Sequence, residues 1–212
     1  MTRAFLILAI AALAASKAVS AAEPYSPCGP LLGLGFGPFD YRTASEKEKD
    51  IVESHHFTPD VASLRSGSTS SLGGDLDYTL RAFPNHPRAL LAMSNLAQRT
   101  NTDKPTGARW NVDCYFERAI RWQPDDPSVR LVYAIHLTRR NQKELARKQL
   151  DIAEQNAIDS ANFRYNLGLA FLDVGDYEHA LKHAWRAEAL GYELHGLRRR
   201  LEAAGKWRNP DS

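Results

Sequence analysis

The stretch that decides the fold is 160–187, SANFRYNLGLAFLDVGDYEHALKHAWRA, read beside 126–153, DPSVRLVYAIHLTRRNQKELARKQLDIA. The later stretch begins thirty-four residues after the earlier one. The positions that match are Ala134 with Gly168, Leu137 with Phe171, Asn141 with Gly175, Ala146 with Ala180, and Ala153 with Ala187. Small residues and a turn residue therefore recur at one period, which predicts a repeated structural unit.

The residue types within each unit indicate a pair of closely packed helices. Residues 112–120 place apolar side chains at i, i+3, i+4, i+7 and i+8, which is the buried stripe of one helix. Ala134 and Gly168 have little or no side chain, so a paired helix can approach closely there. Asn141 and Gly175 tolerate the left-handed conformation that ends a helix. The sequence therefore predicts an all-helical chain.

These residues also carry a family resemblance. The motif Leu167-Gly168-x-x-Phe171, followed by Gly175-Asp176-Tyr177 and Ala180, resembles the tetratricopeptide repeat (TPR), which has this period. The resemblance covers 72–205, and it implies a right-handed solenoid of helical hairpins closed by a capping helix. The segment 75–87 is similar to a stretch of exported bacterial TPR-containing proteins.

Weaker signals divide the rest of the chain. Asp126-Pro127 is a capped helix start. Pro84-Asn85-His86-Pro87 parallels Pro124-Asp125-Asp126-Pro127, so we expect another helix start there, and we read 100–107 as a lengthened turn between the two units.

We expect a helix over 76–83 that begins at Asp75, a Ser/Gly loop over 66–74, and short helices near 45–54 and 58–64. Leu194, Leu197, Leu201 and Ala204 predict the final capping helix. The expected parts are 1–21 as a signal peptide, 22–44 as a Pro/Gly-rich arm, 45–71 as short helices and a loop, 72–205 as the solenoid, and 206–212 as a tail.

The first residues read as an export signal. Arg3 precedes an apolar run over 4–15, and Val19-Ser20-Ala21 offers small side chains, so we expect cleavage between Ala21 and Ala22. The chain has 27 Lys and Arg against 25 Asp and Glu, and Arg3 and Lys17 leave with the signal. The remaining charges balance, which argues against nucleic acid as the main partner. We expect an exported periplasmic protein without a transmembrane segment.

Two cysteines fit an oxidising compartment. Cys28 and Cys114 can form one disulfide, which over so long a loop would stabilise the fold by about 4–5 kcal/mol. Two separate thiols, one of them buried, are the alternative. If the bridge forms, it pins the arm over the solenoid, and the repeat register places Cys114 on the outer face of its helix.

The TPR resemblance implies that a peptide or protein segment binds along the first helices of the pairs. The groove residues implied by register are Arg88, Leu91, Asn95, Gln98, Arg99, Leu131, Ile135, Thr138, Arg139, Tyr165, Asn166, Leu169, Leu172 and Asp173. Apolar members would bury side chains of a peptide, while amides and guanidinium groups would hold its backbone and carboxylates. Alternatively, Ile135, Leu169 and Leu172 pack on the arm or the capping helix.

Other chemistry has weaker support in the sequence. A clamp for the C-terminal carboxylate of a peptide uses asparagine and basic side chains, and this chain offers Asn95, Asn166, Arg88 and Arg99. The fit is partial, because Asp173 stands where a further basic residue would help. His179 and His183 are spaced i, i+4, yet no neighbour in the sequence offers a third ligand, so we expect a surface pair without metal. No hydrolase or metalloprotease motif occurs.

These patterns favour a non-enzymatic adaptor that needs no cofactor and binds another envelope protein. The alternative is a structural subunit that assembles as a homo-oligomer and whose groove is filled by its own arm or by a neighbouring chain.

Overall fold

The computed structural model describes residues 26–193 and 195–209, and these residues contain helices and loops but no strand. The predicted signal peptide, the predicted cleavage point and Leu194 lie outside the described residues. The helices of the described part are α1 Glu46–His56, α2 Pro59–Ala62, α3 Leu72–Ala82, α4 Pro87–Thr100, α5 Val112–Trp122, α6 Pro127–Arg139, α7 Lys143–Gln155, α8 Ala161–Val174, α9 Tyr177–Ala189 and α10 Gly196–Ala203. The prediction of an all-helical chain is confirmed.

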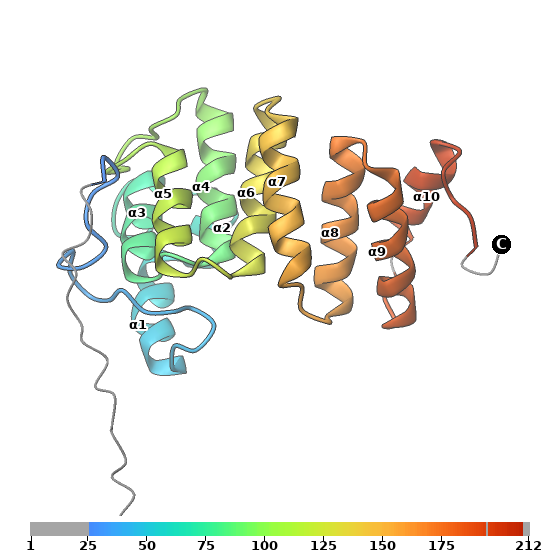
Figure 1. Cartoon of the computed structure of the whole chain (residues 1–212). Helices are drawn as coiled ribbons and strands as arrows, with labels where there is room; N and C mark the ends of the chain where they lie inside the picture. The colour runs from blue at the N-terminus through green and yellow to red at the C-terminus, as the bar shows by residue number, and fades with distance from the viewer. Residues whose placement is uncertain (1–25, 194, 210–212) are drawn as a thin grey trace, which may run out of the picture.

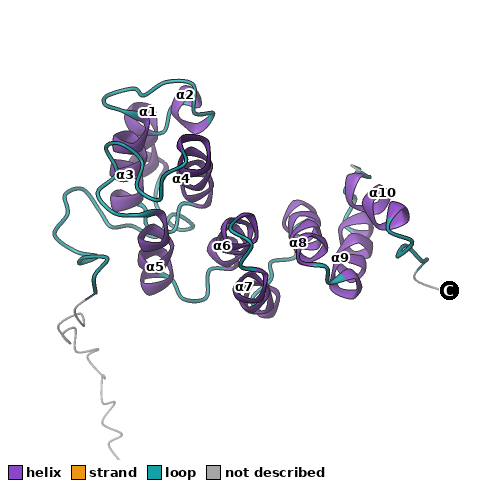
Figure 2. Cartoon of the chain, turned by 90° about the horizontal axis from the view of Figure 1, so that it is seen from above, coloured by secondary structure: helices purple, strands orange, loops and turns teal. Residues whose placement is uncertain are grey.

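From α6 to α10 the helices stand side by side in a row that follows the chain, and α3, α5 and α4 stand beside its first end, with α1 below them (Figure 1). Seen from above, α4, α6 and α8 form one layer, and α5, α7 and α9 form the other (Figure 2). Consecutive helices pack as α6 with α7 and α8 with α9, while α4, α6 and α8 also contact one another in sequence. Among the described helices, none is both long and apolar enough to cross a lipid bilayer.

Small residues and left-handed turns occupy the positions that the repeat predicts. Ala134 and Gly168 are buried, and a Cβ on Gly168 would lie 2.5 Å from Cδ2 of Leu197 and 3.2 Å from the carbonyl oxygen of Ala180. Asn141 and Gly175 have φ values of 59° and 88° after α6 and α8. The close approach of α8 to α9 and α10 therefore depends on the missing side chain at residue 168.

We expect Gly168→Val to lower the free energy of unfolding by about 1–3 kcal/mol, because the added atoms overpack the contact with α9 and α10. Urea denaturation followed by circular dichroism measures the change. Ala189→Val, at an exposed position in the last turn of α9, is the control. Equal stability of the two variants would contradict the close approach.

Helix α3 differs from the prediction at its start. It begins at Leu72 with Ser71 as the N-cap, so residues 72–74 are helical and Asp75 lies inside the first turn. The helix keeps two glycines because the 101–111 loop crosses them: a Cβ on Gly73 would lie 2.3 Å from the carbonyl oxygen of Thr106. A tertiary contact thus outweighs the usual helix-breaking tendency of glycine.

Asp75 is a buried acceptor and not a cap. Its carboxylate accepts hydrogen bonds from Oγ1 of Thr69 at 2.6 Å and from the backbone N–H of Ser68 at 2.7 Å. Burial alone would raise the pKa of Asp75, but these bonds outweigh it and lower the pKa to about 2. The 66–71 part of the predicted loop is therefore held by α3.

The first part of the chain confirms the two short helices. Helix α1 has Ser45 as its N-cap, with a reciprocal capping box to Glu48, and α2 has Thr58 as its N-cap followed by Pro59. The parallel between the two Pro-x-x-Pro starts is also confirmed, because His86 caps α4 as Asp126 caps α6.

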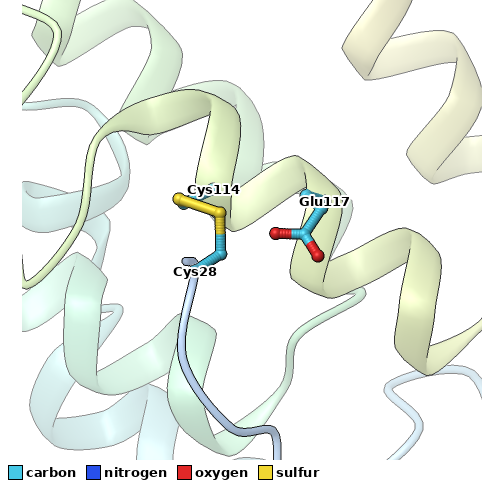
Figure 3. Close-up of side chains that lie close together, drawn as sticks. All are labelled: Cys28, Cys114 and Glu117. Carbon is cyan, nitrogen blue, oxygen red and sulfur yellow. A yellow bond between two sulfur atoms is a disulfide. The ribbon is translucent and has the colours of Figure 1, made fainter. Parts of the chain in front are cut away.

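The arm is held by a disulfide between Cys28 and Cys114, whose Cα atoms are 5.0 Å apart (Figure 3). Separate thiols are therefore excluded. Cys114 faces away from the α5 core residues, as the register predicts, but the arm covers it, and it is 8% exposed. Nη1 of Arg118 donates to the carbonyl oxygen of Cys28 at 3.2 Å, and Nη2 of Arg121 donates to that of Gly29 at 2.7 Å.

Farther along, the arm is bound to two helix starts. The backbone N–H of Tyr41 donates to Oδ1 of Asn85 at 2.9 Å. Nδ2 of Asn85 donates to Asp40 at 2.7 Å and to the α6 N-cap Asp126 at 2.9 Å. Asn85 is fully buried, so one amide joins the arm to the starts of α4 and α6.

At the other end, α10 buries Leu197 and Leu201 against α8 and α9, as expected of a capping helix. The described tail is bound to α9: Nε1 of Trp185 donates to the carbonyl oxygen of Arg208 at 3.0 Å.

We expect Cys114→Ser to lower the melting temperature and to expose residues 26–44 to proteases while the helical circular dichroism stays nearly unchanged. The bridge restricts the unfolded chain, and its loss costs up to about 4–5 kcal/mol. Reduced wild-type protein should behave like the variant. A wild-type melting temperature that is the same with and without reductant would contradict this role.

Candidate functional site

Two pockets lie on the layer formed by α4, α6 and α8. The α4–α6 pocket, of about 280 Å³, lies between the ends of α4 and α6 and includes Gln98 and Arg139. The α6–α10 pocket, of about 240 Å³, lies between α6, α8 and α10. Arg139 lines both pockets, so they adjoin along one face of the row.

The α6–α10 pocket brings together six of the residues that the resemblance implies. These are Ile135, Thr138, Arg139, Asn166, Leu169 and Asp173. Ile135 and Leu169 are half-buried and pack on the core beneath, while Arg139 and Asp173 are exposed. The pocket thus combines an apolar floor with a polar rim. The capping helix contributes Arg200, whose Nη2 donates to Oδ1 of Asp173 at 2.6 Å.

Of the other implied residues, Gln98 lines the α4–α6 pocket, and the rest are engaged elsewhere. Leu131 and Leu172 are buried in the core, and Leu91 packs against the core of the first helices. Tyr165 stacks on Tyr192 with ring centroids 4.2 Å apart. Its hydroxyl also lies against Gly196, at the start of α10. Tyr165, which the alternative did not name, thus contacts the capping helix, whereas Ile135 and Leu169, which it did name, line the α6–α10 pocket.

The residues of the possible carboxylate clamp do not meet in one pocket. The guanidinium group of Arg88 lies over the ring of Phe57, and Nη1 of Arg99 donates to the carbonyl oxygen of Leu64 at 2.6 Å. Both arginines thus hold the segment that contains α2. Asn95 accepts a hydrogen bond from Arg139, while Asn166 lies in the α6–α10 pocket.

Ser94 and His136, which line the α4–α6 pocket, form a polar chain with Asp113. Oγ of Ser94 lies 2.8 Å from Nδ1 of His136, and Nε2 of His136 lies 3.5 Å from Oδ1 of Asp113. The order resembles a nucleophilic triad, but Ser94 is 3% exposed. It also lies inside α4, where backbone N–H groups bond within the helix and cannot hold an oxyanion. We therefore assign this chain to the packing of α4, α5 and α6.

The disulfide has a carboxylate beside it. Sulfur atoms of Cys28 and Cys114 and an oxygen of Glu117 lie within 4.8 Å of one another (Figure 3). Glu117 accepts a hydrogen bond from Oγ of Ser26 at 3.0 Å and pairs with Arg121 at 2.7 Å. With both sulfurs in the bridge, this group serves to fix the arm.

The expectation of a surface histidine pair is wrong. His183 is 0% exposed, and Nε2 of His183 lies 3.1 Å from Oε1 of Glu154, which comes from α7. Nε2 of His179 lies 3.5 Å from the other oxygen of Glu154. The sequence distance between Glu154 and the histidines hid this neighbour. Helices α7 and α9 meet here through long side chains, and the repeat period alone does not predict which side chains reach across.

No protein-family model matches the chain, and no curated protein matches it.

Burial makes the charged form of two histidines unfavourable. Burial lowers the pKa of His183 from 6.5 to about 4, against the opposing attraction of Glu154, and burial also lowers the pKa of His86. A histidine whose pKa is lower in the folded state stabilises the fold above pH 6.5, and this contribution disappears as the pH falls toward about 4.

We therefore expect the melting temperature to fall between about pH 6.5 and pH 4, and to fall less in His183→Asn, which cannot titrate. Thermal unfolding across this range measures the slope. His55→Asn, at an exposed position on α1, should keep the wild-type slope. A slope in His183→Asn equal to that of the wild type would contradict the assignment.

Proposed function

We propose that α4–α5, α6–α7 and α8–α9 are tetratricopeptide-type units of a right-handed solenoid, with α10 as the cap. Three observations support this. The starts of α6 and α8 follow the sequence period, the small residues Ala134 and Gly168 are buried between helices, and left-handed residues end α6 and α8.

The protein acts as a non-enzymatic adaptor that binds an extended peptide or protein segment along the α4, α6 and α8 layer. The observation that carries this proposal is the pair of adjoining pockets that share Arg139. A segment lying across both would place apolar side chains on Ile135 and Leu169 and bond to Asn166 and Arg139. The groups of the rim suit hydrogen bonding to a peptide backbone.

The proposal also covers where the protein works in the cell. The adaptor is exported by its signal peptide and works in the periplasm, where its partner is another envelope protein. The Cys28–Cys114 disulfide supports an oxidising compartment, because such bridges are rare in the reducing cytosol.

The test uses the mature chain and a displayed library of linear peptides. We expect selected peptides to bind with at least about tenfold lower affinity to the double variant Arg139→Ala, Asn166→Ala, because both side chains line the α6–α10 pocket. Fluorescence anisotropy measures the affinity. Tyr165 is left unchanged, because its stacking on Tyr192 makes it part of the capping contact.

The matched control is Arg186→Ala, which removes an exposed arginine of α9 that pairs with Asp159. It should bind the peptides as the wild type does. Undiminished binding by a folded double variant, or equal loss in the control, would move the binding site away from the two pockets.

A second candidate is a structural subunit of an envelope assembly, with the groove filled by the protein's own arm or by a neighbouring chain. The described part of the arm bonds to α3, α5 and Asn85, as with Nη1 of Arg81, which donates to the carbonyl oxygen of Leu34. These contacts favour the neighbouring-chain form. A monomer by light scattering over the working concentration range would count against it.

A further inference from the structure

The charges that line the two adjoining pockets do not balance. Three arginines line them, Arg139, Arg140 and Arg200, against two aspartates, Asp103 and Asp173. Surfaces that associate present complementary charges. The excess positive charge therefore suits a bound segment that brings a negative one.

Two of the three arginines are neutralised by their neighbours. Nη1 of Arg140 donates to Oδ1 of Asp103 and lies 3.9 Å from Oδ2 of Asp113. At the other end of the pockets, Nη2 of Arg200 donates to Oδ1 of Asp173 at 2.6 Å. Because each of these charges is cancelled within the protein, neither the two arginines nor their aspartates select the charge of a bound segment.

The third arginine, Arg139, is held by a neutral partner. Its Nη1 donates to Oδ1 of Asn95, which comes from α4, so the amide joins the end of α6 to the neighbouring helix. Among the described residues, no carboxylate forms an ion pair with Arg139, and its side chain is exposed. A guanidinium group has further N–H donors in its planar fork. Asn95 thus fixes the guanidinium group without neutralising it.

The position of Arg139 favours a side-chain carboxylate over a chain terminus. Arg139 lines both pockets, so a segment that occupies both crosses it and continues on either side. A C-terminal carboxylate at Arg139 would end the segment there and leave one pocket empty. An Asp or Glu within the segment can form the paired N–H···O bonds that guanidinium and carboxylate groups prefer, while its backbone runs on.

The spacing along α6 places an apolar contact next to this charge. Ile135 precedes Arg139 by one helical turn and is half-buried. Side chains so spaced on a helix have Cβ atoms about 5–6 Å apart. In an extended segment, side chains two positions apart point the same way and lie about 6.5 Å apart. One segment can therefore meet Arg139 and Ile135 with residues two positions apart.

From binding across the two pockets, the proposed function on which this rests, we infer that the partner is an acidic peptide segment. It carries an internal Asp or Glu that pairs with Arg139, and an aliphatic residue two positions away that packs on Ile135 and Leu169. A Lys or Arg in place of the acidic residue would bring like charges together, which weakens binding.

The test uses the peptides that the mature chain selects from the displayed library, synthesised with an amidated C-terminus. We expect them to contain an Asp or Glu two positions from a Leu, Ile or Val. Replacing that acidic residue by its amide should weaken binding to the wild type about three- to tenfold at low salt, where screening is weakest. Fluorescence anisotropy measures both affinities.

Arg139→Gln removes the charge from an exposed side chain and should bind the acidic peptide and its amide form equally, because the difference belongs to the pair. Arg186→Gln is the matched control. It changes an exposed arginine of α9 in the same way and should keep the wild-type difference between the two peptides.

The outcomes separate the acidic partner from the proposed function. Peptides that lose affinity in Arg139→Ala, Asn166→Ala but bind equally as acid and amide would overturn the acidic partner alone. A difference that persists in folded Arg139→Gln would do the same, as would binding that requires a free C-terminal carboxylate. If no peptide binds, or if the double variant binds undiminished, the proposed function fails and this inference with it.

Discussion

The constraint on which the structure depends is the close approach of neighbouring helices at positions that lack bulk. At residue 168 the carbonyl oxygen of Ala180 and the side chain of Leu197 occupy the space in which a Cβ would lie. Ala134 is buried at the corresponding position of α6. Interiors are packed to high density, so such positions fix the distance between helices, and with it the position of every side chain on the outer faces.

The helices and their ends were predictable because local chemistry decides them. Asp126 with Pro127, Ser45 with Glu48, and the left-handed Asn141 and Gly175 act within one turn of the chain. The start of α3 was not predicted, because two glycines disfavour a helix there, and the loop that leaves no room for a side chain at Gly73 lies more than thirty residues away in the sequence.

The candidate site was predictable in part, for the same reason. Register placed Ile135, Asn166 and Leu169 on one face, and the structure brings them together in the α6–α10 pocket, since helical periodicity carries from one unit to the next. It could not show that Arg88 and Arg99 hold the α2 segment or that Tyr165 meets Tyr192. Those partners belong to irregular segments outside the repeat. Glu154 was missed because nothing in its own neighbourhood in the sequence marks it.

The disulfide also has a mechanical consequence. It closes a covalent ring from Cys28 to Cys114, across 86 positions, which contains α1 to α4 and the start of α5. A force that pulls the two ends of the chain apart passes directly through the bridge, and the ring transmits the tension without lengthening. Each residue outside the ring can add about 3.3–3.6 Å to the length of the stretched chain, while the residues inside the ring add nothing to it. Under tension, the half of the protein that carries α6 to α10 yields, and the half beneath the arm stays closed.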